Sequence, residues 1–516
     1  MPRPVLSFRG VAAGSSLLAL VLVSQHAAAD ERRRAAEIEH DAAASAEETE
    51  DDDGASAEET RDRAARPGGP PIETGEKRPA VDYDGRGAAP ASTGDVLLWV
   101  PRILLSPLYL VSEYVVRRPL GWVVTTAERE EIPTLLIDFF TFGPDRAAGI
   151  VPTALIDFGL RPSVGLYFFY DGAFHPDNHL RARTAWGGSD WFLFHATDRV
   201  EIASGRSVSL KGKFLQRPDF IYHGEGPLSD DDDRGRYFSR MLGGWLEYRL
   251  DSWRSSMLDA SVGVRNTNYD AARGCCDNPS VDVRVAEGAY PEPVAIDDGF
   301  LVFEQSLDLT LDTRLPRHQE NQRDASDFES PTGSGLRLDV RALHATSLDR
   351  RAPLSGAAAE RFHWMRYGGT LGGFLDLAGQ QRTLGLSLVV DFADPLQQGG
   401  SIPFDELVSL GGARPLRGFL EGRLRGRSAA AAVLEYTWPI WVWLDGSLHY
   451  AAGNAFGPQL DGFDAELLRS SFGIGIETNA RRDHAFQMLL AFGAERFETG
   501  AGIESVRFVL GATDGF

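Results

Sequence analysis

Cysteine is nearly absent from this chain, which contains two among 516 residues, adjacent at Cys275 and Cys276. In an oxidising compartment such a pair could close as a vicinal disulfide or remain as two thiols. No further cysteine and no nearby histidine stands at the spacing of metal ligands. We therefore expect a structural role for the pair in a loop, and we expect neither a metal nor a cofactor.

Long apolar helices are missing beyond residue 148, and clusters of basic residues are missing throughout. The formal net charge is -22, and the short basic run at 32–34 is flanked by acidic residues. Because phosphate binding requires clustered Lys and Arg, this balance argues against a nucleic-acid partner.

The N-terminal residues have the layout of a cleaved secretory signal peptide. Arg3 and Arg9 precede an apolar run over 11–23, and small residues follow at Ala27 and Ala29. The alternative is a short anchoring helix, although the run is shorter than the roughly 20 residues that a span needs. We predict a signal peptide over 1–29, and a mature protein that leaves the cytoplasm.

Residues 30–94 contain almost no large apolar side chain and many charges. Such a segment cannot bury enough surface to offset the entropy of ordering, so it is expected to be a disordered acidic low-complexity tether.

A helical segment is expected over 95–131. Within 95–122, apolar residues recur at helical spacing, as at Ile103, Leu104 and Leu108, while Pro101, Pro107 and several charges make a membrane span unfavourable. An amphipathic helix on the periplasmic membrane face, a helix docked at the barrel mouth and a true span all stay open.

Beyond residue 148, segment after segment alternates apolar and polar residues with period two. In 300–312, for example, Leu307, Leu309 and Leu311 alternate with polar residues, and 207–214 and 471–477 behave alike. Both a soluble sandwich and a membrane barrel show this alternation.

Three features favour the barrel: the signal peptide, strands of about ten residues, and aromatic residues near strand ends such as Trp438, Trp441 and Tyr450. Short turns also alternate with long polar connections. We therefore predict an all-β fold, a transmembrane antiparallel barrel of about sixteen strands within 148–516. A long turn near 313–332 has no sequence-based explanation.

The stretch "LGGARPLRGFLEGRLRGR" at 410–427 closes the predicted sixth external loop, 394–427. Some twenty residues separate Asp394 from Arg417, enough at roughly 3.3 Å each to fold back into the barrel. An arginine there needs anions, and Glu435 and Asp445 are predicted to point inward from strands twelve and thirteen. A turn of three residues would make the two acids near-diagonal neighbours that Arg417 bridges.

Four motifs together resemble one family. "LRGF" at 416–419, "LEYTWP" at 434–439, "WLD" at 443–445 and the final "SVRFVLGATDGF" resemble the barrel of the BamA/TamA outer-membrane assembly superfamily, also called the bacterial surface antigen family. In that family a V-R-G-F/Y motif on the sixth loop folds into a sixteen-stranded barrel and meets acids on strands twelve and thirteen. The resemblance implies the following residues: a loop-lock motif of Arg417, Gly418 and Phe419, acidic partners Glu435 and Asp445, a supporting Trp443, and a C-terminal barrel signal of Phe508, Leu510 and Phe516.

The sequence also departs from the family pattern. Leu416 replaces the usual Val and Trp443 the usual Phe, and residues 30–147 offer no room for a folded array of POTRA domains. The resemblance therefore implies a barrel-only member of the family, in the Gram-negative outer membrane with its tether in the periplasm.

Two functions follow as hypotheses. The first is insertion or translocation of proteins or lipids through a barrel that opens sideways between strands one and sixteen. Its implied partners are outer-membrane lipids and lipopolysaccharide, the assembly machinery for its own insertion, and unfolded outer-membrane proteins or lipids as cargo. Pro152 in strand one and Gly511 in strand sixteen predict a weak seam. The second is a passive or gated pore, or a surface scaffold.

Enzymatic activity is not expected. Ser447 and His449 share one inner face, but no third group is placed to orient the histidine. The acidic run at 229–233 could bind calcium or bridge lipopolysaccharide, whereas charge runs on outer loops are usually solvated.

Overall fold

The computed structural model describes residues 139–271, 276, 279–316, 331–348, 361–377, 381–413, 415–441, 444–478 and 484–514, together with Tyr114 and Arg118. All belong to the unit Gly94–Phe516. The predicted signal peptide, the tether and nearly all of the 95–131 segment lie outside these residues, as do Trp443 and Phe516. Among the described residues, no helix has both the length and the apolar character needed to cross a membrane.

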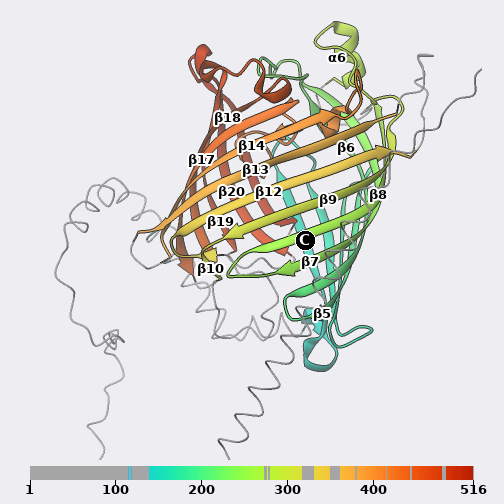
Figure 1. The fold of residues 1–516 in the computed structure, drawn as a ribbon, viewed down its shortest axis with the longest axis vertical. Coiled ribbons are helices and arrows are strands. Elements are labelled where there is room, and N and C mark those ends of the chain that lie inside the picture. The colour runs from blue at the N-terminus through green and yellow to red at the C-terminus, as the bar shows by residue number, and fades with distance from the viewer. Residues whose placement is uncertain are drawn as a thin grey trace, which may run out of the picture. The chain divides into compact units, whose positions relative to one another are not determined.

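Sixteen antiparallel strands form a closed barrel, because the first of them pairs with the last (Figure 1). The strands are β2 (Ala148–Asp157), β3 (Ser163–Asp171), β4 (Asn178–Gly188), β5 (Trp191–Ala203), β6 (Arg206–Tyr222), β7 (Gly235–Asp251), β8 (Met257–Ala271), β9 (Phe300–Asp312), β12 (Gly335–Ser347), β13 (His363–Asp376), β14 (Thr383–Pro395), β17 (Ser428–Trp441), β18 (Leu444–Phe456), β19 (Arg469–Thr478), β20 (His484–Arg496) and β21 (Ile503–Asp514). The predicted fold class and strand number are confirmed. Strand lengths range from 9 residues in β3 to 17 in β6 and β7.

The barrel has its polar side chains inside and its apolar side chains outside. In β6, Ser207 and Ser209 are buried while Leu210 is 63% exposed. In β9, Glu304 is buried while Leu307 is 50% exposed. A soluble sandwich would show the opposite arrangement, so this burial pattern decides for a membrane-spanning barrel.

Long connections gather at one rim of the barrel, which we call the loop rim. They are residues 223–234, 272–299, 348–362, 396–427 and 457–468, and the second of them carries α6 (Val281–Glu287), at the top of Figure 1. In the same connection Cys276 is disulfide-bonded, and Cys275, the only other cysteine in the sequence, lies outside the described residues. Three short 3-10 helices also lie at this rim: η4 (Pro458–Leu460), η5 (Ala465–Leu467) and η6 (Phe497–Thr499).

The opposite rim has mostly short turns. The long connection 313–334 is the exception, as the sequence indicated, and it contains the two-stranded hairpin β10 (Leu315–Pro316) and β11 (Pro331–Thr332). Ahead of the barrel, β1 (Thr141–Phe142) and η2 (Pro144–Arg146) lead into β2, and β1 pairs with the start of β2.

The closing junction between β2 and β21, which we call the seam, is short. Its register pairs are Leu155 with Gly511, Ile156 with Leu510, and Asp157 with Val509. The β2–β3 junction, by comparison, stays paired from Ala148 to Leu155. Gly511 has φ +137°, and a Cβ there would lie 2.0 Å from the Ala154 carbonyl oxygen, so this end of the seam accommodates only glycine without a shift.

Candidate functional site

The connection between β14 and β17, residues 396–427, folds back into the barrel, and we call it loop 6. A short hairpin of β15 (Val408–Leu410) and β16 (Leu424–Gly426) holds its two ends together. The 3-10 helix η3 (Phe404–Glu406) precedes the hairpin, and the "RPLRGF" stretch follows β15.

Arg417 is buried inside the barrel and faces the inner wall. Its Nη2 lies 3.0 Å from Oε1 of Glu435 on β17, with 4% and 17% of the two side chains exposed. A charge pair of this kind contributes little when solvated, but breaking it at low exposure leaves an uncompensated charge. The ion pair between Arg417 and Glu435 therefore stabilises the contact of loop 6 with β17.

The register between β17 and β18 differs from the sequence-based expectation. Glu435 pairs with His449, and Asp445 pairs with Pro439, so the two acids are not near-diagonal neighbours. Asp445 lies four positions along β18 from His449, about 13 Å at the usual rise per residue. The expectation assumed a turn of three residues, whereas β17 extends to Trp441 through an irregularity after Pro439 and β18 starts at Leu444.

Gly418 brings the backbone of loop 6 close to the barrel wall. Its N–H donates to Oγ of Ser471 at 2.8 Å, and its carbonyl accepts from Oγ of Ser505 at 2.8 Å. A Cβ at this position would lie 2.2 Å from the carbonyl of Phe492, so only glycine fits without a shift. His449 also reaches this point, with Nε2 3.4 Å from Oγ of Ser471.

Phe419 is 1% exposed and packs against the inner wall of the barrel. A Cβ added to Gly493 of β20 would lie 2.7 Å from the Phe419 ring, so the ring occupies the space that this glycine leaves. Two residues of the predicted C-terminal barrel signal, Phe508 and Leu510, lie within the described residues. Both are partly exposed on the outer side of β21, where they alternate with the buried Arg507 and Val509.

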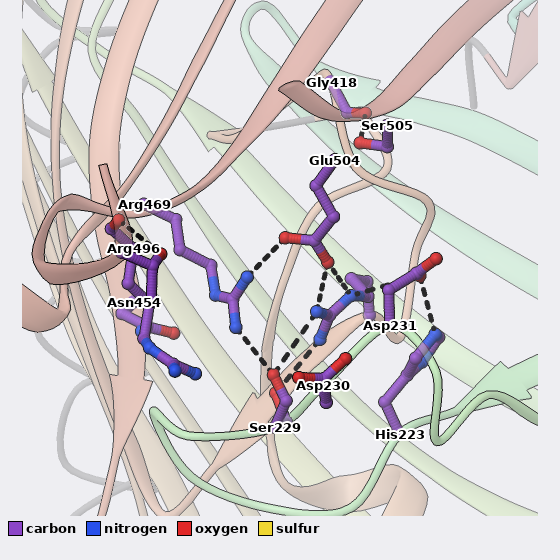
Figure 2. A network of polar contacts seen from close by, with 12 residues as sticks. His223, Ser229, Asp230, Asp231, Gly418, Asn454, Arg469, Arg496, Glu504 and Ser505 are labelled. Atoms are coloured by element: carbon purple, nitrogen blue, oxygen red, sulfur yellow. Dashed lines mark hydrogen bonds and ion pairs between the residues drawn. The ribbon is translucent and has the colours of Figure 1, made fainter. Parts of the chain in front are cut away.

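A second set of charges anchors loop 6 to β21 and β19 (Figure 2). Glu504 accepts from Arg423 of loop 6, with Nε at 2.8 Å, and forms a further ion pair with Arg469. All three side chains are buried, with exposed fractions of 3% for each arginine and 7% for the glutamate. The Glu504 carboxylate thus pairs with two buried guanidinium groups from different parts of the chain.

The same arginines also hold the 223–234 connection. The Ser229 carbonyl accepts from Arg469 Nη2 at 2.6 Å and from Arg423 Nη2 at 3.3 Å, and Ser229 Oγ accepts from Arg423 Nη1 at 3.0 Å. Asp231 accepts from Arg234 at 2.6 Å and lies 3.6 Å from Arg423. Part of the acidic run at 229–233 is therefore engaged in ion pairs rather than simply solvated.

His223 lies at the edge of this network, fully buried beside Asp231 and Arg234. Its Nε2 is 3.3 Å from Asp231 Oδ1 and accepts from Arg234 Nε at 3.3 Å. Burial lowers the pKa of His223 to about 3, and this effect outweighs the attraction of Asp231, while Arg423 and Arg234 lower the pKa further. The imidazole is consequently neutral at physiological pH.

Acid is expected to loosen this rim through His223. The unfolded chain binds a proton at the histidine below pH about 6.5, whereas the folded chain does not until about pH 3. Lowering the pH from 7.5 to 5 is therefore expected to lower the free energy of unfolding by about 2 kcal/mol, because the unfolded chain gains a proton at His223 and the folded chain does not. The check is the unfolding midpoint at both pH values, with His223→Gln expected to show a shallower loss. An equal loss in both proteins would contradict the prediction.

An aromatic cluster packs loop 6 near the loop rim. Phe404 is fully buried, with its ring centroid 5.3, 5.0 and 4.9 Å from those of Tyr222, Tyr237 and Tyr269. Aromatic pairs at such separations stabilise beyond their buried area. Arg425 adds a bond to the Phe404 carbonyl at 3.1 Å.

Charges flank the aromatic cluster on its inner side. Glu406 lies 2.8 Å from Arg265 of β8, and Arg265 also lies 3.0 Å from Glu304 of β9. Neighbouring Asp405 is buried, and burial together with the charge of Glu406 raises its pKa to about 6. Loop 6 thus has ion pairs with β8, with β17 and with β21.

Next to Arg417 lies a cavity of about 930 Å³, lined by loop 6 and the inner faces of β8, β9, β12–β14, β17 and β18. Its lining mixes both signs of charge, including Asp308, Arg341, Asp391 and Glu435. Opposite charges pair within the lining, as in Arg341 with Asp391 at 2.9 Å. The lumen is therefore polar without a single dominant charge. Within the described residues, no group of three or more potential metal ligands occurs.

Sequence reasoning named Arg417, Gly418, Phe419 and Glu435 as site residues, and it did not name the charged residues of the first and last strands that form ion pairs in the structure. Glu504 and Arg507 on β21, Asp157 on β2 and Arg423 in loop 6 all make buried ion pairs. One signal was present: Asp157 and Arg507 both stand on the polar side of their alternating strands, with opposite charges, on the two strands that must close the barrel.

No protein-family model matches the chain, and no curated protein matches it. Among solved structures, it is similar to BamA from Haemophilus ducreyi lacking POTRA domains 1–3, at 13% identity over 71% of this chain and 70% of that one, with a TM-score of 0.46. It is also similar to CdiB from Acinetobacter baumannii, at 10% identity over 71% and 60% with a TM-score of 0.42. CdiB from Escherichia coli gives 9% identity over 72% and 64% with a TM-score of 0.44. The chain thus spans less than two thirds of either CdiB structure.

Proposed function

We propose that this protein is an outer-membrane barrel that assists the insertion or translocation of proteins or lipids, with loop 6 as a plug and the seam as the side that opens. The observation that carries the proposal is the short seam, with three register pairs at Leu155–Asp157 of β2 and one further backbone bond from the Phe158 N–H to the Phe508 carbonyl at 2.9 Å, beside a loop anchored in the lumen. Opening a sheet costs least where fewest backbone hydrogen bonds must break.

The loop-lock role of Arg417, Gly418 and Phe419 belongs to this proposal. The pairing of Arg417 with Glu435 supports it, as does the fit of Gly418 against Phe492. Asp445 stands in the proposal as a further acid of the β18 inner face, away from Glu435 along the strand. The membrane would be the Gram-negative outer membrane, with the loop rim outside, because bacterial barrels place long loops outside and short turns in the periplasm. The partners would then be lipopolysaccharide, the assembly machinery during its own insertion, and unfolded barrel proteins or lipids as cargo.

A passive or gated pore is the second candidate, and the cavity of about 930 Å³ behind loop 6 favours it. A polar lumen of this size needs only a partial withdrawal of the loop to conduct ions. In that case the seam would stay closed and loop 6 would set the width of the lumen.

A crosslink across the seam separates the two candidates. The full mature chain, with Cys275→Ser and Cys276→Ser, receives Ile156→Cys and Leu510→Cys, which are register partners. The matched control is Ile474→Cys with Leu490→Cys, partners across β19 and β20 that are both 38% exposed. Each protein is reconstituted in liposomes and assayed for ion conductance and for assisted insertion of an unfolded barrel substrate.

We expect insertion to be accelerated by the reduced seam pair and abolished when that pair is oxidised, whereas the control pair inserts substrate in both states. Conductance without assisted insertion, indifferent to oxidation of the seam, would reject the proposal in favour of the pore.

A further inference from the structure

Arg507 joins the two strands of the seam. It lies on the inner face of β21 and is 8% exposed. Its Nε donates to Asp157 Oδ1 at 2.9 Å and its Nη2 donates to Asp157 Oδ2 at 2.7 Å, so the contact between β21 and β2 is bidentate. Paired hydrogen bonds of this geometry are the strongest type of Arg–carboxylate contact. This contact adds a side-chain link to the three register pairs of the seam and to the Phe158–Phe508 contact beside them.

The same guanidinium also holds loop 6. Nη1 of Arg507 donates to the carbonyl oxygens of Gly412 and Arg417, the latter at 3.2 Å. These carbonyls are fixed by the fold of the loop, because the Gly412 N–H donates to the Phe419 carbonyl at 2.8 Å. One side chain therefore uses opposite edges of its planar group for the seam and for the loop.

Arg417 takes part in two contacts that hold loop 6, one through its side chain and one through its backbone. Its side chain pairs with Glu435 of β17, while its backbone carbonyl accepts from Arg507. The contacts form a continuous path from Glu435 through Arg417 and Arg507 to Asp157. If Arg417 leaves Glu435, its carbonyl moves with it, and the buried Nη1 of Arg507 loses an acceptor. A guanidinium in this setting then shifts toward other acceptors and weakens its fork on Asp157.

We propose that Arg507 is a positioning residue that couples loop 6 to the seam, so that release of Arg417 from Glu435 loosens the pairing of β2 with β21. Coupling of this kind is a free energy shared by two sites, and it acts equally in both directions. Its functional meaning rests on the proposed lateral opening, but the coupling itself exists in a barrel without cargo.

The test is hydrogen exchange of seam amides in the full mature chain in lipid, read on peptides that contain Leu155–Phe158. Three variants are compared with the wild type: Glu435→Gln, which weakens the anchor of loop 6; Arg507→Lys, which keeps the charge but loses the fork; and the double variant. We expect each single variant to speed seam exchange about tenfold or more. The double variant should be no faster than Arg507→Lys alone.

A matched control is available on the far side of the barrel. Arg249 of β7 makes the same bidentate contact with Asp259 of β8, with Nη2 at 3.1 Å from Oδ2. Arg249→Lys should speed exchange only at β7–β8 and leave the seam unchanged. Asp157→Asn, which keeps an acceptor for Arg507, replaces Arg507→Lys if the lysine variant does not fold.

Two results would overturn the proposal: unchanged seam exchange in Arg507→Lys or in Glu435→Gln, or a Glu435→Gln effect of equal size with and without Arg507. Failure of the proposed function is distinguishable from either. If the Glu435 and Arg507 variants show coupled seam exchange but the protein does not assist insertion, this inference stands and the insertase function is rejected. If the protein assists insertion but the two variants act independently on seam exchange, the insertase function stands and this inference is rejected.

Discussion

Replacing Glu504 by alanine is expected to lower the free energy of unfolding by about 3–5 kcal/mol, because it removes the carboxylate that pairs with the buried Arg469 and leaves Arg423 with only the longer contact to Asp231. Arg423 and Arg469 are each 3% exposed and share this carboxylate. The measurement is the denaturant midpoint of the folded barrel in lipid vesicles. Glu504→Gln, which keeps one acceptor oxygen but no charge, should fall between the wild type and the alanine variant.

The matched control for Glu504 is Glu498, which pairs with Arg496 at 2.7 Å near the same rim but is 36% exposed. An exposed pair of this kind is worth about 0–1 kcal/mol, so Glu498→Ala should leave the midpoint nearly unchanged. Equal losses from Glu504→Ala and Glu498→Ala would show that burial of the network contributes nothing to its strength.

Replacing Arg417 by alanine is expected to free loop 6 and raise the ion conductance of the reconstituted barrel. The change removes the ion pair between loop 6 and Glu435 on the inner wall, at a cost of about 3–5 kcal/mol to the anchored state of the loop. Planar-bilayer recordings measure the conductance, and limited proteolysis of 396–427 reports the exposure of the loop. Both proposed functions predict this result, so it tests the plug and not the insertase.

Two further variants distinguish the contribution of the Arg417 charge from that of the close packing of loop 6 against the barrel wall. Arg417→Lys keeps a cation but cannot form a planar fork, so an intermediate conductance is expected. Gly418→Ala leaves the ion pair intact but sets a Cβ 2.2 Å from the Phe492 carbonyl, which should displace the loop from β20. A conductance unchanged in all three variants would mean that loop 6 does not obstruct the lumen.

Much of the barrel was predictable because period-two alternation is a local property of the sequence. Side chains such as Leu307 and Leu311 reach lipid, and Glu304 reaches the lumen, wherever the strand stands in the sheet. The strand number and the inward direction of Glu435 follow from the same pattern. The position of Gly418 beside the wall could also be expected, since a tight approach requires a residue without a Cβ.

The register between strands was not predictable in the same way. If β18 shifts along β17 by an even number of residues, Ser447 and His449 still point into the lumen. The sequence therefore does not distinguish the observed pairing of Glu435 with His449 from a pairing of Glu435 with a residue nearer Asp445. The turn between β17 and β18 sets this register, and its length was misjudged because β17 continues past Pro439.

The sequence by itself determined an inside-out barrel of sixteen strands with an arginine-bearing loop long enough to enter it. Only the tertiary structure decided that the loop is anchored to β21 as well as to β17, and that Arg507 joins it to the seam. The reason is that these contacts connect residues far apart in the chain, such as Asp157 and Arg507 at a separation of 350 positions. Barrel closure sets which of the many inward charges meet, and no local pattern encodes that choice.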